Sequence, residues 1–257
     1  MDRAGSEHEV RFAAMVASAA RAIRAAWPAF VMAWVARGAL EAAPRLLRPA
    51  HALGAVRVFD PVQIAIGLAV GAAVAVVSGL LIRRLLEPRA TAMRLDLRLA
   101  GYVALIVAWN LISVGVALAA APHPRGLPAH ALLSQMVWFN AAAIGRPLVA
   151  AALALWPVSV LVGDRLPPLR AVRLMGQAYG PFLLAAILLS LPGVLLGVIP
   201  ILTRHVSTAP PDRLWVVAIS SLTTTASTFV LAQVYSRRLR GTDLATPGSG
   251  AGVLASA

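Results

Sequence analysis

The sequence contains no cysteine and no lysine, and it has few charged residues of any kind. Without cysteine, disulfide bonds, thiolate catalysis and cysteine-based metal sites are excluded. Only 13% of the 257 residues are charged, 60% are hydrophobic, and the mean hydropathy is +0.80. Because a soluble domain has about 25% charged residues, this chain carries too much apolar surface for one soluble core. We therefore predict an integral membrane protein.

All 23 basic residues are arginines, and they give the chain a net charge of +13. Such a charge first suggests nucleic-acid binding. The arginines lie, however, in short segments between apolar runs, which is the pattern of anchoring on the cytoplasmic side of a membrane. We expect contact with anionic lipids at the cytoplasmic face and no nucleic-acid partner.

Six apolar segments are predicted to cross the membrane, since a crossing helix needs about 20 mainly apolar residues. They are 26–43, 62–82, 99–121, 131–163, 177–202 and 214–235. The first is the weakest, because Arg37 and Glu41 interrupt it. The fourth has 33 residues, which would reach about 50 Å. We expect it to have an interfacial first part and a break near Gly145, Arg146 and Pro147.

The distribution of arginine among the loops favours six spans. If Arg37 is counted with the first loop, the segments between and around the spans carry, in chain order, four, four, five, one, three, two and three arginines. With six spans and the N-terminus inside, 15 arginines lie inside and 7 outside; without segment 26–43 the two sides hold 11 each. Because arginine-rich loops stay in the cytoplasm, we expect both termini there, in a bacterial inner membrane. Tyr102, Tyr179 and Tyr235 would then lie at headgroup level.

The fold class predicted is all-α, a polytopic helix bundle in three parts. These are an amphipathic interfacial helix (1–25), a six-helix membrane domain (26–240) and a disordered tail (241–257). The first part would place Val10, Met15 or Val16, and Ile23 toward lipid on the cytoplasmic leaflet. The tail is rich in small residues, which disfavours a packed structure.

Small residues recur every four positions in segment 62–82, at Gly67, Gly71, Ala75 and Gly79. Such a stripe lets two helix backbones approach closely. We expect it to pack against another helix of the same chain. A homodimer interface, or contact with another membrane protein, is the alternative.

Arg146 is the candidate for a polar or anion-binding site, together with Asn110, Asn140 and Thr224. A guanidinium in hydrocarbon is costly, so it usually faces a cavity, a partner or an interface. Asn140 is near Arg146 in sequence, Asn110 lies within the third span, and Thr224 belongs to the hydroxyl-rich sixth. In the alternative interpretation Arg146 reaches outward to the membrane surface, and the hydroxyls bond to their own helix.

Catalytic patterns are missing from the sequence. It has no P-loop, nucleophile elbow or HExxH motif, and no acid lies in the middle of a predicted span. We predict no catalytic residue, metal ligand or cofactor, and a non-enzymatic role that is structural, lipid-interacting or partner-scaffolding. The alternative is a small transporter or permease component that uses Arg146 and the sixth span.

Three runs carry a family resemblance. After Arg146 comes LWPVSVLVGDRLPPLRAVRLMGQAYGPFLL (155–184); VYSRRLRG (234–241) follows the last span, and LEPRATAMRLDLRLAG (86–101) precedes the third. Together they resemble bacterial membrane proteins related to the membrane domain of glycerophosphoryl diester phosphodiesterases and to YciC-like inner-membrane proteins. The resemblance implies a six-helix membrane architecture. It implies no catalysis, because the acidic metal site of the phosphodiesterase domain has no counterpart here.

Overall fold

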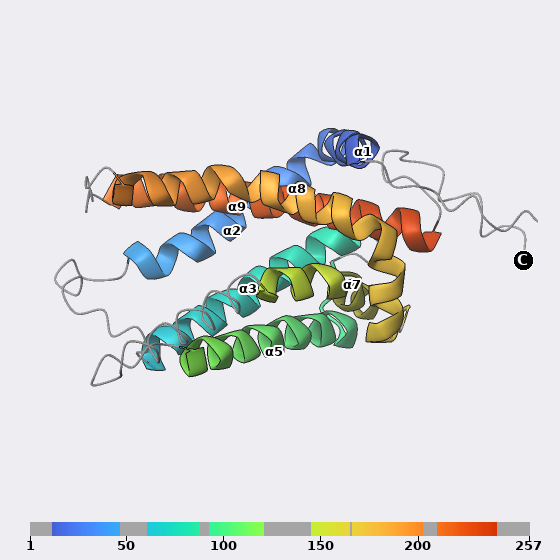
Figure 1. Ribbon diagram of the computed structural model, residues 1–257, viewed down its shortest axis with the longest axis horizontal. Helices are drawn as coiled ribbons and strands as arrows, with labels where there is room; N and C mark the ends of the chain where they lie inside the picture. The colour runs from blue at the N-terminus through green and yellow to red at the C-terminus, as the bar shows by residue number, and fades with distance from the viewer. Residues whose placement is uncertain are drawn as a thin grey trace, which may run out of the picture.

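A computed structural model describes residues 12–46, 61–87, 93–120, 145–164, 166–202 and 210–240. These residues form helices and short connections without a strand (Figure 1), which confirms the predicted all-α class. The helices are α1 (Phe12–Ala25), α2 (Trp27–Leu46), α3 (Pro61–Leu86), α5 (Leu97–Ala120), α7 (Leu155–Val162), α8 (Pro168–Leu202), α9 (Pro210–Tyr235) and the π-helical η2 (Ser236–Arg240). The predicted tail and residue Asn140 lie outside the described residues.

Four described helices are long and apolar enough to cross a membrane. They are Ile64–Leu86, Leu97–Val116, Gly145–Val162 and Leu214–Leu239. A fifth crossing is present if the two arms of α8, Pro168–Gly176 and Ala178–Pro192, count as one bent span. These helices are those of a membrane-embedded protein. By length and composition alone α2 is not among them.

Helix α8 bends by 84° between its two arms. Pro181 explains the position of the bend, because proline has no N–H for the carbonyl four residues earlier and its ring clashes with that carbonyl. That carbonyl belongs to Gln177, the residue between the arms. The shorter arm therefore turns away from the direction of the longer one (Figure 1).

The fourth predicted segment is helical from Gly145 onward, with a turn at Ala154 that leads into α7. Pro157 withdraws the donor that would bond to residue 153, which accounts for this irregularity. Helix α7 ends at Gly163, whose φ of 93° is left-handed and whose N–H donates to the Ser159 carbonyl. Glycine tolerates this conformation as a helix cap.

The helices pack side by side, with α3 against α5, α9 against α8, and α2 between α3 and α9 (Figure 1). Phe30 of α2 meets Phe229 of α9 edge to face, with 5.6 Å between ring centroids. Aromatic pairs favour this arrangement. Helix α2 thus links α3 with α9, which also contact each other directly.

Helix α1 packs on α8 and α9 through one face, made by Met15, Ser18, Ala19 and Ala22. Of the two residues predicted as alternatives toward lipid, Met15 is buried in the bundle and Val16 is exposed. Arg21 and Arg24 are exposed as well. The bundle itself supplies an apolar partner for Met15, which sequence periodicity cannot distinguish from lipid.

Candidate functional site: a charge pair inside the bundle

Helix α2 has an apolar face turned outward and a charged face turned inward. The exposed positions follow helical spacing: Pro28, Met32, Val35, Ala36 and Ala39. Met32 and Val35 are 62% and 58% exposed. At 3.6 residues per turn, positions 37 and 41 fall on the opposite side of the helix. A helix with its polar side inward suits lipid as its surroundings.

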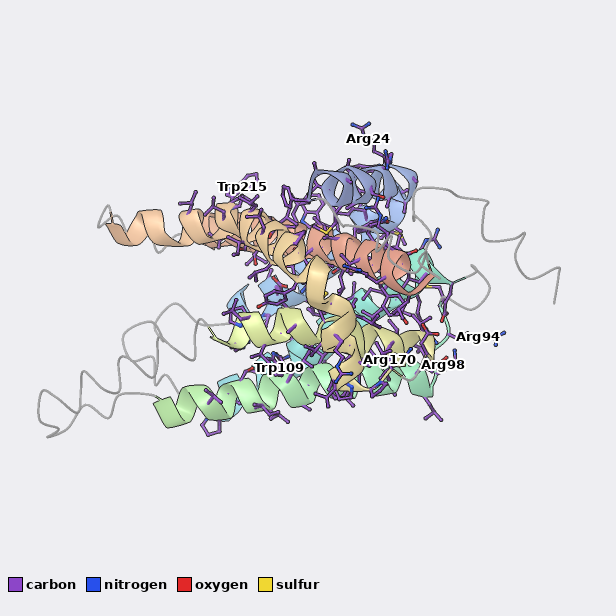
Figure 2. The ribbon with its side chains drawn as sticks, turned by 45° about the vertical axis from the view of Figure 1, so that its right-hand side comes forward. Arg24, Arg94, Arg98, Trp109, Arg170 and Trp215 are labelled. Carbon is purple, nitrogen blue, oxygen red and sulfur yellow. The ribbon has the colours of Figure 1, made fainter. Side chains whose placement is uncertain are left out.

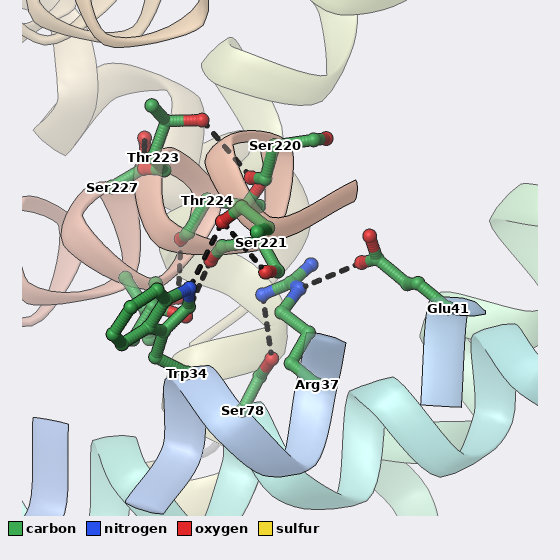
Figure 3. Close-up of polar contacts among 12 residues, drawn as sticks. Trp34, Arg37, Glu41, Ser78, Ser220, Ser221, Thr223, Thr224 and Ser227 are labelled. Carbon is green, nitrogen blue, oxygen red and sulfur yellow. Dashed lines mark hydrogen bonds and ion pairs between the residues drawn. The ribbon is translucent and has the colours of Figure 1, made fainter. Parts of the chain in front are cut away.

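Arg37 and Glu41 form an ion pair on this inner face. Arg37 Nε donates to Glu41 Oε1 at 3.1 Å, and Nη1 donates to Ser78 Oγ of α3 at 3.3 Å (Figure 3). The side chains are only 14% and 22% exposed. The carboxylate offsets the guanidinium charge, which is how ionised groups persist within membrane helices.

The pair lies at mid-depth of the helix. Arg37 is ten residues beyond Trp27, the first residue of α2, and at 1.5 Å per residue this is about 15 Å. The hydrocarbon layer of a membrane is about 30 Å thick. If α2 crosses it, the pair sits close to its middle.

Two contacts hold α2 against α9 beside the pair. The Trp34 indole N–H donates to the Ala218 carbonyl at 2.9 Å (Figure 3). A Cβ added at Gly38 would stand 3.2 Å from Ser221 Oγ, so the backbone of α2 approaches α9 closely. Small residues permit such an approach. The Arg37 guanidinium is thus enclosed by α2, α3 and α9.

The hydroxyls of α9 bond to their own helix. Six of the seven hydroxyls at positions 220–228 donate to a carbonyl three or four residues earlier, as Thr224 does to Ser220 at 2.7 Å (Figure 3). The others are Ser221, Thr223, Thr225, Ser227 and Thr228. Such back-bonding satisfies the hydroxyl without a partner on another helix. This row is therefore not a chain of polar groups that reaches across the bundle.

The predicted site residues are placed separately. Arg146 is exposed at the start of its helix, and Asn110 faces Gly71 of α3. Thr224 is bonded within α9. Within the described residues no hydrogen bond or ion pair joins these three, and Asn140 lies outside the described part of the chain.

The small-residue stripe of α3 lies along α5. A Cβ at Gly79 would be 2.7 Å from Leu99 Cδ1 and 3.1 Å from Tyr102 Cδ1, and one at Gly71 would be 3.1 Å from Asn110 Nδ2. Ala75 is buried between them. Around Gly67 nothing lies within 4 Å. Three of the four positions therefore make a contact within the chain.

A second buried arginine, Arg83, lies in the last turn of α3. Its Nη2 is 2.5 Å from Asp96 Oδ2, its Nη1 donates to the Arg94 carbonyl at 2.7 Å, and its Nε lies 3.6 Å from Glu87 Oε2. The side chain is 2% exposed. It ties the end of α3 to the segment that leads into α5.

Asp96 has two roles at this junction. One carboxylate oxygen binds Arg83, and the other accepts the Leu99 N–H at 3.0 Å in the first turn of α5. Aspartate is a favoured residue at this capping position. The hydrogen bond from Arg83, followed by that from Leu99, lowers the pKa of Asp96 below its ordinary value of 3.8.

The same end of the bundle joins α5, α7 and α9. Arg98 donates to the Val162 carbonyl at 3.2 Å, and the Tyr235 hydroxyl donates to Asp164 Oδ2. Tyr102 and Tyr235 are buried within the bundle, and their expected depth at headgroup level stays a prediction. Sequence position alone does not reveal that both rings face the protein interior.

Comparison with protein-family models, with curated proteins and with solved structures found no match. Among the described residues no three histidine, aspartate or glutamate side chains come together as a metal site. The apolar helices are those of a membrane-embedded bundle, and the charge pair lies inside it.

Sequence reasoning missed the Arg37–Glu41 pair as a site, although it named both residues as interruptions of the first span. The signal was their spacing. Oppositely charged residues four apart on a helix meet each other, and an apolar segment that carries such a pair still presents a low net charge to its surroundings.

Proposed function

We propose that this chain is a six-span bacterial inner-membrane protein with both termini in the cytoplasm. Its role is non-enzymatic: it binds anionic phospholipids with its arginine-rich end and so serves as a lipid-interacting scaffold. The relationship to the phosphodiesterase membrane domain and to YciC-like proteins belongs to this proposal. The back-bonded hydroxyls of α9 and the closely packed stripe of α3 support a bundle without a transport path along those faces.

The count of six adds α8 and α2 to the four apolar helices. The longer arm of α8 packs along α9. The bend at Gln177 divides α8 into two arms, which meet the criteria for a membrane span only when they are taken together. Helix α2 carries three charged residues, yet its exposed face is apolar and its ion pair is turned inward. That orientation supports a crossing helix, because a surface helix would turn its charges outward.

One observation carries the lipid role. The three most exposed large apolar side chains among the described residues are Leu97, Leu95 and Leu169, at 90%, 80% and 77%. Each is next in sequence to an exposed arginine, and these are Arg98, Arg94 and Arg170. Figure 2 shows the three arginines at the same end of the bundle. Leucine beside arginine suits the boundary between acyl chains and phosphates.

The bend in α8 explains how its short arm reaches this position. Within that arm Ala171 and Met175 are buried against the bundle, while Arg170 and Arg173 are exposed. The arm thus has one protein-facing side and one basic side. Arginines near an anionic membrane surface contribute about 1 kcal/mol each.

A lipid-competition experiment tests this proposal. The protein is reconstituted into nanodiscs of phosphatidylcholine with or without phosphatidylglycerol, and bound dansyl-phosphatidylglycerol is titrated. Replacing Arg94, Arg170 and Arg173 by glutamine should weaken binding about a hundredfold, given about 1 kcal/mol per arginine. The matched control is Arg146→Gln, an exposed arginine in another helix, which should leave the affinity unchanged. Equal affinities for the triple variant and the wild type would contradict the lipid role.

Membrane topology is tested separately. Because the chain has no cysteine, one introduced cysteine is a unique label site. Ala129 belongs to the segment between the third and fourth predicted spans, which the proposed topology puts outside. With a membrane-impermeant maleimide on intact cells, Ala129→Cys should react and Ala14→Cys should react only after lysis. The reverse pattern would contradict the orientation.

A small transporter or permease component is the second candidate. Arg146 and Thr224, which suggested it, have no contact with each other. The Arg37–Glu41 pair favours it instead, since paired charges inside a membrane often mark a substrate path.

A further inference from the structure

We propose that Arg37 and Glu41 form a binding site for a zwitterionic group, one that carries an ammonium and a phosphate or carboxylate. The inference rests on the six-span arrangement, in which α2 crosses the membrane. It does not depend on lipid binding by the arginines at the end of the bundle.

The pair has binding capacity left over. Arg37 uses Nε and Nη1, and Glu41 uses Oε1. Within the described residues Arg37 Nη2 and Glu41 Oε2 take part in no hydrogen bond. Although both side chains point into the bundle, 14% and 22% of their surfaces stay accessible. A guanidinium has five N–H donors and a carboxylate about four acceptor sites, so the pair offers donors and acceptors side by side.

The charges of the pair select the ligand. A simple anion that approaches Arg37 meets the Glu41 carboxylate, whose oxygen is 3.1 Å from the guanidinium. A simple cation that approaches Glu41 is repelled in turn by the Arg37 guanidinium. In a medium of low dielectric constant these repulsions are strong. A zwitterion aligned against the pair satisfies both groups, its anionic end on Arg37 and its ammonium on Glu41.

The guanidinium is also held in position before a ligand arrives. Ser78 of α3 fixes one of its nitrogens, Glu41 fixes another, and Trp34 anchors α2 to α9 one turn away. A donor that is already oriented loses less entropy when it binds a ligand. In Figure 3 the guanidinium lies between α2, α3 and the hydroxyl-bearing stretch of α9.

Two sources share this chemistry: the headgroup of phosphatidylethanolamine, and a soluble zwitterion without acyl chains. The probes are therefore short-chain dihexanoyl-phosphatidylethanolamine and glycerophosphoethanolamine, which carry the same headgroup with and without chains. Dihexanoyl-phosphatidylglycerol serves as the anionic comparison. Binding to the full chain in maltoside micelles is measured by titration calorimetry.

We expect saturable binding of the phosphatidylethanolamine probe, at least about tenfold tighter than that of phosphatidylglycerol, because a charged hydrogen bond to Glu41 is added. Equal binding of glycerophosphoethanolamine would identify a soluble zwitterion as the ligand. Clearly weaker binding of it would identify the lipid.

The variant that removes the site is Arg37→Met/Glu41→Leu, since replacing both members of a buried pair by apolar residues of similar size is often tolerated. Thermal unfolding checks that it remains folded, and Glu41→Gln provides a second, milder variant. Both should lose at least about tenfold in affinity, whereas Arg146→Gln should bind like the wild type. Unchanged binding by either site variant, absence of saturable binding to the wild type, or a preference for phosphatidylglycerol would overturn the proposal.

Discussion

Two buried arginines, Arg37 and Arg83, occupy different regions of this bundle and are paired in different ways. Arg83 lies at the end of α3 and meets two carboxylates and a backbone carbonyl, which connect α3 to the start of α5. Arg37 lies in the middle of α2 and meets one carboxylate of its own helix and one hydroxyl of α3. The first arrangement connects chain segments. The second leaves donors and acceptors free.

The comparison shows that burial alone does not tell whether a charged side chain connects two helices or offers a binding site. At Arg83 the partners come from residues before and after a turn, so the contacts fix the connection between two helices. At Arg37 the carboxylate partner is four residues along the same helix, so their bond fixes no connection. In a pair of this kind the two charges neutralise each other inside the membrane. Their unused donors and acceptors stay available to a ligand.

The largest effect is expected for Arg83→Met. The substitution leaves Glu87 and Asp96 without their shared cation, and breaking a buried pair on one side costs about 3–5 kcal/mol. Chemical unfolding in detergent micelles measures the loss. Arg84→Met, at an exposed neighbour, should change the unfolding free energy by less than about 0.5 kcal/mol. Similar small losses for both variants would show that the Arg83 contacts are not structural.

Glu41→Leu should follow, with a loss of about 2–3 kcal/mol, because Arg37 keeps only the Ser78 contact. Adding Arg37→Met should recover most of that loss. At the other site, Arg83→Met/Asp96→Leu should recover less, since Leu99 loses its capping carboxylate as well, a loss of about 1 kcal/mol. The same unfolding measurement compares the two double variants. Equal recovery at both sites would remove the distinction between them.

Gly79→Ala probes the face of α3 that packs against α5, one turn before Arg83. The added Cβ would lie 2.7 Å from Leu99 and near Tyr102, so the neighbours must shift, at about 1–2 kcal/mol. Gly67→Ala, with open space around it, should be neutral or slightly stabilising because alanine favours helix. Thermal unfolding distinguishes the two. A reversed order would mean that the stripe does not face α5.

The smallest effect near neutral pH is expected from the titration of the Asp96 carboxyl group, which becomes protonated only in acid. Its pKa is lowered in the folded protein by the hydrogen bond from Arg83 and then by that from Leu99. A lowered carboxyl pKa contributes stability that is complete above the unfolded value and is lost as the pH falls through the folded value. Stability should therefore decline below the ordinary value of 3.8. In Asp96→Asn the decline should be shallower; an identical acid profile would exclude this carboxylate as its source.

Much of the fold was accessible from the sequence, because apolar length and the all-helical class depend only on local composition. The glycine stripe came from spacing in the same way, whereas the break expected near Gly145 stays a prediction, because residues 145–153 are continuous helix and residues 121–144 lie outside the described part of the chain. The position of the bend in α8 was not predicted, although Pro181 marks it, because α8 contains several prolines and each of them could bend a long apolar run. The sequence could not show that Met15, rather than Val16, and Tyr235 face the protein interior, because lipid and protein interior are equally apolar.

The candidate site was not predictable for a related reason. In the sequence Arg37 and Glu41 only interrupt the first predicted span. A sequence shows which residues are charged, but it does not show whether a helix turns them toward lipid or toward the protein. The exposure pattern of Met32, Val35 and Ala36 supplies that direction. Arg146 attracted attention through its isolation, and the structure places it on the surface.

The central claim is that α2 crosses the membrane with its apolar face in lipid and its charge pair inside. Electron paramagnetic resonance of a spin label on Ala36→Cys, in an otherwise cysteine-free chain, tests it most directly. In nanodiscs the label should collide readily with oxygen, which concentrates in hydrocarbon, and rarely with a water-soluble nickel chelate. Ready collision with the nickel chelate at Ala36 would place α2 at the membrane surface and contradict the account.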